Sequence, residues 1–236
     1  MRIALFGYGK MGKMIEQIAL KRGHSITAKI DIDTTAIDFS NIDVAIDFSQ
    51  PNAAFENIKN CITHNVPIIS GTTGWLANYD DAVSFCNENK GAFIYASNYS
   101  LGVNIFFELN SYLAKMMKSL DQYNVTMEEI HHTQKLDAPS GTAITLAEGV
   151  IAETKHKKWE LDKAEDDTTI PIVAKRINDV PGTHTVAYDS IVDNIEIKHT
   201  AHNREGFALG AVIAAEWIIG KTGVFNMKDV LNLNKK

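Results

Sequence analysis

The 236-residue sequence contains only two cysteines and no apolar run that approaches the length of a membrane-spanning helix. Cys61 and Cys86 are too few for a disulfide framework or a cysteine-bound metal, and both lie in stretches patterned as amphipathic helices. We therefore expect two core thiols in a reducing compartment. A spanning helix needs about 20 consecutive apolar residues, and Gly7 interrupts the N-terminal run too early for a signal peptide. These features predict a cytoplasmic protein without a membrane partner.

Positive charge is also limited, because 23 Lys and Arg residues against 29 Asp and Glu residues leave a formal net charge of -6. Binding to nucleic acid without sequence preference requires a basic face that displaces counterions from phosphates. We therefore expect no nucleic-acid partner, although a local cationic pocket is compatible with this composition. A hydrophobic content of 45% over this length fits one large or two modest globular domains.

Strand-like and helical patterns alternate along the first part of the chain. Short apolar runs predict strands at residues 2–6, 25–30, 44–48, 66–70 and 92–96. Helical patterns lie between them, at about 11–21, from a start at 49–51, and across 80–89. Strands that alternate with helices in this way form a parallel sheet that helices cover on both faces. The sequence therefore predicts an α/β fold of the Rossmann type in this part.

The pattern changes after Asn98. The polar segment 155–167 is predicted to be a solvated loop, helices are predicted at 103–120 and 143–154, and strands at 123–130, 170–177, 183–190 and 191–198. This arrangement predicts an inserted α+β domain with a mixed, mostly antiparallel sheet. Helices at 206–219 and 226–233 are expected to return to the first domain. The predicted domains are therefore residues 1–98 with 206–236, and residues 99–205.

A glycine-rich motif lies between the first strand and the first helix. The run Gly7-Tyr8-Gly9-Lys10-Met11-Gly12 fits G-x-G-x-x-G, and Asp31 ends the next predicted strand. Glycines at these positions let the backbone approach a pyrophosphate, while the helix N-terminus offers free N–H groups. In this context the motif predicts a dinucleotide site. A plain strand-to-helix turn that contains glycines is the alternative.

Asp31 bears on the choice of cofactor. A carboxylate at this place accepts hydrogen bonds from an adenosine ribose and repels the 2′-phosphate of NADPH. The next residue, Ile32, provides no cation, although Lys10 and Lys13 could bend toward a phosphate. We therefore predict that NADH serves at least as well as NADPH. The alternative is that Asp31 is only a turn residue.

A second loop with two glycines follows the strand predicted at 66–70. Gly71-Thr72-Thr73-Gly74 lies at the carboxyl edge of the predicted sheet, where ligands of such folds bind. Glycines and hydroxyls suit close contact with a nicotinamide ribose or carboxamide. Composition alone is equally compatible with a plain loop.

The stretch from Glu129 to Thr142 carries most of the chemistry in the second part of the chain. It places His131, His132 and Lys135 shortly before a predicted helix that begins after Pro139. Backbone amides at a helix N-terminus, hydroxyls and an ammonium together suit a carboxylate. Histidine is the natural proton donor near neutral pH. The stretch therefore predicts an anion-binding acid/base site.

Two other interpretations of this stretch are weaker. Adjacent histidines on a strand point to opposite faces, and no carboxylate is obviously spaced to join them, so we predict no metal site. A histidine pair on the surface without a function is the other alternative.

The order of these motifs makes a family resemblance specific. The chain resembles the 4-hydroxy-tetrahydrodipicolinate reductase (dihydrodipicolinate reductase) family along nearly its whole length. The segments that carry the resemblance are Gly7–Gly12, Gly71–Gly74, Ala96–Asn104, Glu129–Thr142, and His202-x-Arg204 followed by Phe207–Ala211.

The resemblance implies NAD(P)H-dependent reduction of 4-hydroxy-tetrahydrodipicolinate to tetrahydrodipicolinate in the diaminopimelate route of lysine biosynthesis. It implies a first domain that binds the dinucleotide and a second domain that binds the dicarboxylate substrate and assembles a homotetramer. The implied cofactor contacts are Gly7, Gly9, Lys10, Met11, Gly12, Asp31, Gly71, Thr72, Thr73, Ser97, Asn98 and Tyr99.

The resemblance also implies roles in the second domain. His131 corresponds to the proton donor of the family, and Lys135 is the other candidate for that role. The implied substrate contacts are His132, Lys135, Ser140, Gly141 and Thr142. Ile32 departs from those members that have an arginine for the 2′-phosphate, which again favours NADH.

Two functions from other classes share some of these features. An aspartate or homoserine dehydrogenase would share the glycine-rich motif but gives no reason for the His131 to Thr142 run. A dinucleotide sensor without catalytic activity would need no acid or carboxylate site at all.

Overall fold

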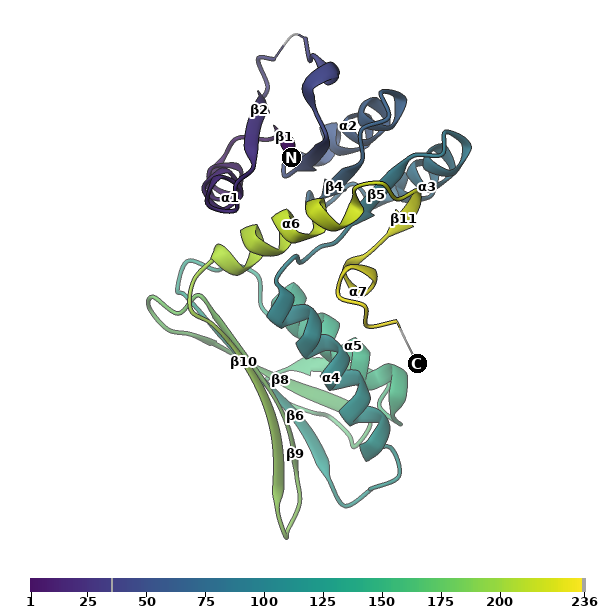
Figure 1. The fold of residues 1–236 in the computed structure, drawn as a ribbon. Helices are drawn as coiled ribbons and strands as arrows, with labels where there is room; N and C mark the ends of the chain where they lie inside the picture. The colour runs from purple at the N-terminus through teal and green to yellow at the C-terminus, as the bar shows by residue number, and fades with distance from the viewer. Residues whose placement is uncertain (35, 235–236) are drawn as a thin grey trace. The chain divides into compact units, whose positions relative to one another are not determined.

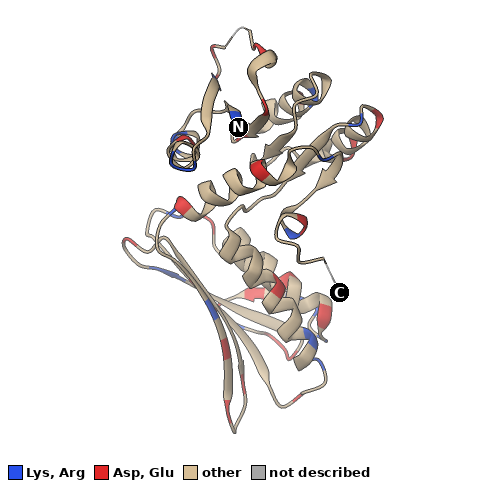
Figure 2. Ribbon diagram, in the orientation of Figure 1, with Lys and Arg blue, Asp and Glu red and all other residues tan. Residues whose placement is uncertain are grey.

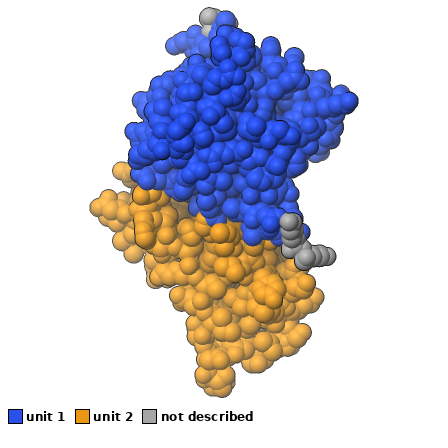
Figure 3. Space-filling view, in the orientation of Figure 1, with its two compact units in different colours: residues 1–101, 205–236 blue, residues 102–204 orange. Residues whose placement is uncertain are grey.

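The computed structural model describes residues 1–34 and 36–234. It separates into two compact units, residues 1–101 with 205–236 and residues 102–204 (Figure 3). The predicted boundaries, after residue 98 and before residue 206, lie close to these. Each unit has hydrophobic core residues of its own.

Unit 1 is built on a parallel sheet with the strand order β11-β5-β4-β3-β1-β2 (Figure 1). All five pairings in this order are parallel, as predicted. The sequence did not predict the short edge strand β11. The bounds are β1 (Arg2–Phe6), β2 (Ser25–Ile30), β3 (Val44–Asp47), β4 (Ile68–Ser70), β5 (Ala92–Tyr95) and β11 (Gly223–Phe225).

Helices cover both faces of this sheet. Ile3 and Leu5 of β1 pack in one core with α1 and α6, while Ala4 and Phe6 pack in another with α2 and α3. Alternate side chains of one strand are therefore buried on opposite faces, which explains its unbroken apolar run. The bounds are α1 (Lys10–Lys21), α2 (Pro51–Thr63), α3 (Tyr79–Glu88), α6 (Glu205–Ile218) and α7 (Met227–Val230), with 3-10 turns η1 (Phe39–Asn41) and η2 (Leu76–Asn78).

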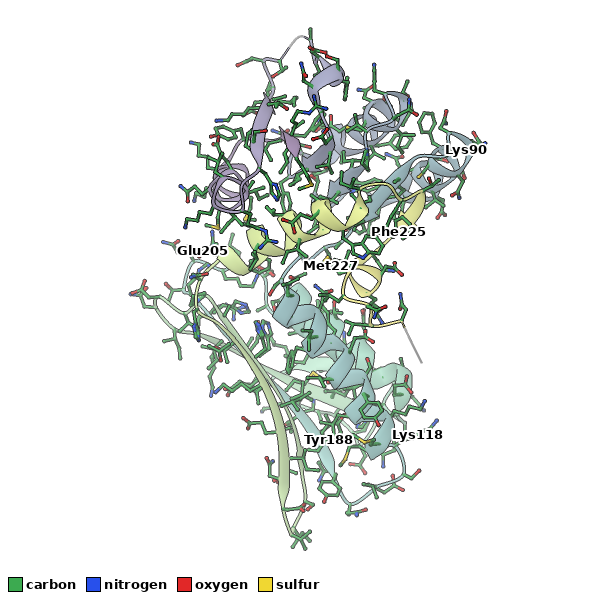
Figure 4. The ribbon with its side chains drawn as sticks, viewed as in Figure 1. Lys90, Lys118, Tyr188, Glu205, Phe225 and Met227 are labelled. Atoms are coloured by element: carbon green, nitrogen blue, oxygen red, sulfur yellow. The ribbon has the colours of Figure 1, made fainter. Side chains whose placement is uncertain are left out.

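Several details of unit 1 follow from single residues. Pro51 occupies the first turn of α2, where its missing N–H costs no helical hydrogen bond. Cys61 and Cys86 are free thiols with no exposed surface, which confirms the prediction of core cysteines. Phe225 and Met227, labelled in Figure 4, join the core that contains α6, so the C-terminal segment packs within unit 1.

Unit 2 contains a mixed sheet with the strand order β10-β9-β6-β8-β7. The pairings β10–β9 and β9–β6 are antiparallel, whereas β6–β8 and β8–β7 are parallel. The sheet is mixed, as predicted, and its two antiparallel ladders are longer than its two parallel ones. The bounds are β6 (Asn124–His131), β7 (Lys158–Leu161), β8 (Thr169–Arg176), β9 (Gly182–Asp189) and β10 (Asn194–Ala201).

Helices α4 (Leu101–Met117) and α5 (Gly141–Glu153) lie along one face of this sheet (Figure 1). Alternate residues of β6 face them, so that Val125 and Met127 pack in the core with side chains of both helices. Tyr188 of β9, labelled in Figure 4, belongs to the same core. The period-2 pattern of β6 therefore sets which of its side chains lie beneath the helices.

Two predictions in unit 2 were wrong. The segment 155–167, predicted to be a loop, contains β7, an edge strand of four residues. Its Trp159 packs against the core, while Lys158 forms an ion pair with Glu160, so charge on the outer face masked the strand pattern. The strand predicted to begin at Ile191 begins at Asn194, because Ile191 lies in the turn between β9 and β10.

The distribution of charged and apolar residues adds two observations. Lys and Arg are interspersed with Asp and Glu along both units (Figure 2). Among the described residues, no helix is both long enough and apolar enough to cross a membrane.

Candidate active site

The glycine-rich motif lies where β1 ends and α1 begins. Gly7 has a φ of +84°, and a Cβ at this residue would lie 2.3 Å from Phe48 O. A Cβ on Gly12 would lie 2.3 Å from Gly7 O, so this glycine lets helix and strand pack closely. Gly9 is the N-cap of α1, without a capping side chain and with no atom within 4 Å of its Cβ position. The helix N-terminus therefore opens onto free space, which fits a pyrophosphate.

Asp31 lies at the carboxyl end of β2. It lines a cavity of about 640 Å³ together with Gly7 and Gly9, so the structure brings the predicted acidic residue to the glycine motif. The Asp31 carboxylate accepts a hydrogen bond from Ile32 N at 2.9 Å and remains exposed. The Ile32 side chain is 81% exposed. An apolar residue thus stands beside the carboxylate, as the sequence indicated.

A neighbouring cavity of about 460 Å³ joins the two predicted cofactor loops. Its lining residues are Gly9, Lys10, Met11, Phe48, Ser49, Pro51, Gly71, Thr72 and Thr73. A Cβ on Gly71 would lie 2.4 Å from the Phe48 ring, so this position also requires glycine. Because Gly9 lines both cavities, the residues predicted to hold the pyrophosphate and the nicotinamide end are continuous in unit 1.

A buried carboxylate that the sequence analysis missed organises this region. Asp47 ends β3 with no exposed surface and accepts hydrogen bonds from three hydroxyls, of Ser49 at 2.5 Å, Ser70 at 2.7 Å and Thr72 at 2.8 Å. Asn57 donates a fourth at 3.1 Å. These contacts tie the ends of β3 and β4 together beside both cavities. The available signal was an acidic residue at the end of a predicted strand.

The other predicted cofactor residues differ in what their side chains can do. The Thr72 hydroxyl is engaged by Asp47, and the Tyr99 side chain is 1% exposed, with its hydroxyl donating to Ser70 O at 3.0 Å. These two side chains are structural, so Thr72 and Tyr99 retain only backbone groups for a cofactor. Ser97 is exposed and Asn98 half-buried, directly after β5.

In unit 2, β6 ends in a group of buried polar side chains. The Glu129 carboxylate is fully buried and accepts hydrogen bonds from Ser140 N at 3.1 Å and from the Arg176 guanidinium at 3.2 Å. Nδ1 of His131 lies 3.3 Å from Glu129 Oε2, close enough for an ion pair but without the alignment of a hydrogen bond. Nε2 of His184 lies 3.7 Å from the same oxygen.

The register of the sheet brings these side chains together. Glu129 and His131 are two residues apart on β6, so both point to the face that α4 and α5 cover. The cross-strand partner of Glu129 is His184 on β9, and the partner of His131 is Arg176 on β8. Strand pairing therefore places one carboxylate, two imidazoles and one guanidinium at the same end of the sheet.

Arg176 also holds the loop that carries Lys135. Its guanidinium donates to Lys135 O at 3.3 Å and to Asp137 O at 2.6 Å. Within the loop, Lys135 N donates to His132 O at 3.1 Å, and His132 is half-buried. Nζ of Lys135 lies 2.8 Å from both carboxylate oxygens of Asp137. The ammonium predicted to hold a substrate carboxylate is therefore paired with a carboxylate of the same loop.

The N-terminus of α5 follows this loop. Ser140 is its N-cap and is 3% exposed; its hydroxyl accepts from Ala143 N at 3.2 Å and lies 3.1 Å from Nε2 of His184. This hydroxyl is therefore the cap of α5, and the role of Ser140 in substrate binding stays a prediction. Gly141 is exposed, Thr142 is half-buried, and first-turn N–H groups have no acceptor within their helix. This helix end can therefore receive a carboxylate.

Burial and contacts shift two titratable groups of this cluster. Burial raises the pKa of Glu129, but contacts with His131 and Ser140 outweigh it and bring the pKa to about 2. Burial, together with the charge of His131, lowers the pKa of His184 to about 4. At neutral pH the carboxylate is therefore ionised and the His184 imidazole is neutral.

We expect the His184 shift to appear as a loss of stability in acid. Because the folded state binds fewer protons than the unfolded state between pH 6.5 and about 4, the stability present above pH 6.5 is lost as the pH falls through this window. The loss should be on the order of 3 kcal/mol. Urea unfolding at pH 7, 5.5 and 4 measures it. His184→Gln should flatten the slope, His64→Gln should retain it, and an unchanged slope in His184→Gln would contradict this account.

The same cluster is the only group of potential metal ligands among residues 1–34 and 36–234. The cluster offers three ligand atoms that lie within 4.8 Å of one another, one each from Glu129, His131 and His184. The premise that no carboxylate joins the histidines was therefore wrong, since Glu129 lies two positions before His131. Because the carboxylate already accepts from Ser140 and Arg176, we interpret the cluster as a hydrogen-bonded network.

Sequence reasoning missed Glu129, Arg176 and His184 as members of the site. Glu129 had a signal, because a carboxylate two residues from a histidine on a strand shares its face. Arg176 and His184 had none. Their position depends on strand register, which a single sequence does not display.

Comparison with known proteins covers both units. The profile described as dihydrodipicolinate reductase, N-terminus, matches residues 1–99, and the one described as dihydrodipicolinate reductase, C-terminus, matches residues 102–231. A 4-hydroxy-tetrahydrodipicolinate reductase of Christiangramia forsetii is 58% identical over 235 residues, covering 98% of each chain. One from Neisseria meningitidis serogroup B is 34% identical over 233 residues, covering 94% of this chain and 85% of the relative.

Solved structures agree in fold. A dipicolinate-bound dihydrodipicolinate reductase from Paenisporosarcina sp. TG-14 superimposes with a TM-score of 0.79 at 22% identity, covering 95% of this chain and 97% of that one. A probable dehydrogenase from Thermotoga maritima reaches 0.57 at 10% identity, with 98% and 92% covered. From the matches in both halves and along the full length, the chain belongs to the dihydrodipicolinate reductase family.

Proposed function

We propose that the chain catalyses the NAD(P)H-dependent reduction of 4-hydroxy-tetrahydrodipicolinate to tetrahydrodipicolinate in the diaminopimelate route of L-lysine biosynthesis. The observation that carries this proposal is the 58% identity to a 4-hydroxy-tetrahydrodipicolinate reductase along 98% of the chain. The reaction consumes the substrate, one reduced cofactor and one proton, and it yields the product, the oxidised cofactor and one water.

The residues of unit 1 fit a dinucleotide. The open space before Gly9 and the uncapped start of α1 suit a pyrophosphate, and Asp31 suits a ribose hydroxyl. Lys10, Met11, Gly71 and Thr73 line the adjoining cavity. When bound, the reduced nicotinamide supplies the hydride. The chain's own contribution is to hold the two ends of the cofactor in fixed positions.

In unit 2 we assign the substrate carboxylates to the loop and helix end that follow β6. Lys135 offers an ammonium, and Gly141 and Thr142 offer backbone N–H groups at the start of α5. His132 is the further donor. Because Lys135 is paired with Asp137, binding of a carboxylate requires the ammonium to exchange partners or to share itself between two anions.

We assign proton delivery to His131. Its Nδ1 faces Glu129, which leaves Nε2 as the atom that can donate. A Cβ at residue 182 would lie 3.1 Å from that nitrogen, so the glycine there keeps its surroundings free of a side chain. Lys135 remains the alternative donor. Whichever of His131 and Lys135 delivers the proton also stabilises the negative charge that develops on the substrate ring as the hydride arrives.

An NADH-oxidation assay with freshly prepared 4-hydroxy-tetrahydrodipicolinate tests the proposed function. Absorbance at the nicotinamide band should fall only when enzyme, cofactor and substrate are all present. Turnover of aspartate or homoserine instead would assign a different reaction. Dinucleotide binding without turnover of any substrate would indicate a sensor.

Cofactor preference is a separate prediction. We expect the kcat/KM for NADH to equal or exceed that for NADPH by up to roughly tenfold, because Asp31 opposes the 2′-phosphate at a cost of about 1–2 kcal/mol. Steady-state rates with both cofactors measure the ratio. Asp31→Asn should reduce the discrimination. A preference for NADPH would show that Lys10 or Lys13 outweighs the carboxylate.

We also propose a homotetramer assembled through unit 2. Strand β10 is an edge of the sheet, and Ile191 and Val192 are exposed beside it. Open sheet edges and apolar side chains favour pairing with a further copy. Light scattering at micromolar concentration should report about four times the 26.1 kDa chain mass. A fully active monomer would contradict this assembly.

The cytoplasm is the proposed location of the protein, supported by the free core thiols of Cys61 and Cys86.

A further inference from the structure

The buried ion pair between Glu129 and Arg176 of unit 2 is not needed to stabilise the fold. Burying an ionised carboxylate is unfavourable unless partners compensate it, and buried ion pairs can often be replaced by apolar residues without loss of stability. Val125 and Met127 precede Glu129 on the same face of β6 and are apolar. Along this face of β6 the side chains therefore change from apolar to ionised at the end of the strand that carries the candidate site.

Apart from a hydrogen bond from Arg176 to Lys175 O, the contacts of this pair lead to residues of the candidate site. Glu129 receives the backbone N–H of Ser140, at the start of the helix assigned to a substrate carboxylate, and it faces Nδ1 of His131. Arg176 binds the backbone oxygens of Lys135 and Asp137. One ion pair thus connects the proposed acid, the proposed cation and the proposed helix end.

We propose that Glu129 and Arg176 are positioning residues: Glu129 orients the His131 imidazole for proton delivery from Nε2, and Arg176 fixes the loop that presents Lys135. The kinetic part of this inference rests on the proposed function. The orientation of the imidazole does not, because it follows from the contacts within unit 2 alone.

Several charged and titratable groups lie around His131 and its neighbours Glu129 and His184. They come from β6, β8, β9 and β10 and from the loop after β6: Glu129, Arg176, His184, His199, Lys135 and Asp137. Glu129 is the buried carboxylate of that set, whereas Asp137 is exposed and paired with Lys135. A carboxylate can only accept, so it favours the imidazole form with a proton on Nδ1.

The matched variants are Glu129→Gln and Glu128→Gln. Glu128 is the neighbouring residue of β6, half-buried on the opposite face, and it pairs with Lys175 of β8 as Glu129 pairs with Arg176. Glu129→Gln should lower kcat about tenfold or more. Glu128→Gln should leave kcat within about twofold of wild type.

Arg176→Gln should produce a different pattern. Because the loop loses its two backbone anchors, the KM for the dicarboxylate should rise at least tenfold, with a smaller change in kcat. NADH affinity, measured by fluorescence, should be unchanged in all three variants. A purely structural role would instead lower the yield of folded enzyme without separating the effect on kcat from the effect on KM.

If the variants fail to fold, a measurement on the wild-type chain decides whether Glu129 orients the His131 imidazole. The imidazole 15N shifts of His131, assigned by their loss in His131→Gln, should show the neutral ring protonated on Nδ1. A neutral ring protonated on Nε2 would overturn the proposal, as would a wild-type kcat in folded Glu129→Gln. Absence of turnover by the wild type would refute the proposed function, while the 15N result would still decide the role of Glu129.

Discussion

His131→Gln is expected to lower kcat by ~10²–10⁴-fold with a smaller change in KM. Glutamine retains a similar size and hydrogen-bonding capacity, but it has no proton to deliver at neutral pH. His131 is 7% exposed and lies beside the Glu129 carboxylate, so the substitution removes the proton source without opening the site to solvent. Steady-state kinetics with saturating NADH separates the two parameters.

The control for this variant is His156→Gln. His156 is also in unit 2; its ring contacts the Thr154 hydroxyl at the end of α5 and lies with Tyr123 and Tyr188 beside the start of β6, whereas His131 is at its end. Its substitution should leave kcat within about twofold. NADH affinity should stay near wild type in both variants, because the residues assigned to the cofactor lie in unit 1. A near-normal kcat in His131→Gln would transfer proton delivery to Lys135 or to bound water.

Lys135→Ala is expected to act mainly on substrate affinity. If the ammonium holds a substrate carboxylate away from bulk water, its removal costs about 2–5 kcal/mol of binding, which raises KM about 30-fold or more. Asp137 makes the result more informative. In the free enzyme it is the partner of Lys135, so the variant also leaves this carboxylate without its cation. Two uncompensated anions then oppose each other in one loop.

Lys175→Ala provides the matched loss of charge. Lys175 lies on β8 next to Arg176 and pairs with Glu128 on the opposite face of the sheet. Its KM should stay within about twofold of wild type, because exposed ion pairs contribute little. An unchanged KM in Lys135→Ala would show that α5 and His132 suffice for the carboxylates. A fall in kcat alone would instead support Lys135 as the proton donor.

In unit 1, local patterns predicted the parallel sheet and several residues that line the two cavities, but not strand β11 or the buried Asp47. The apolar runs, the glycines and Asp31 each act through the backbone within a few residues, and the alternation of strand and helix leaves little choice of topology. Gly7, Gly12 and Gly71 have backbone or aromatic neighbours where a Cβ would be. Such requirements are visible in a sequence because glycine is the residue that meets them.

In unit 2, local patterns predicted the residue types of the site but not their contacts. The run from His131 to Thr142 indicated an acid, a cation and a helix start, and these lie in consecutive segments of the structure. The sequence offered the Ser140 or Thr142 hydroxyl to the substrate, and in the structure the Ser140 hydroxyl accepts a hydrogen bond as the cap of α5. A capping serine and a ligand-binding serine have the same local pattern, so the position of neighbouring groups decides between them.

The sequence by itself determined the order of most elements, the glycine-dependent turns and the residue types of the proposed acid/base site. The tertiary structure decided which partners complete that site. Arg176 is 45 positions after His131, yet it is its partner in the β6–β8 register, and His184 faces Glu129 across β9. Pairing between distant strands depends on how a whole face is buried, because a shift of one residue would turn each side chain to the other side of the sheet.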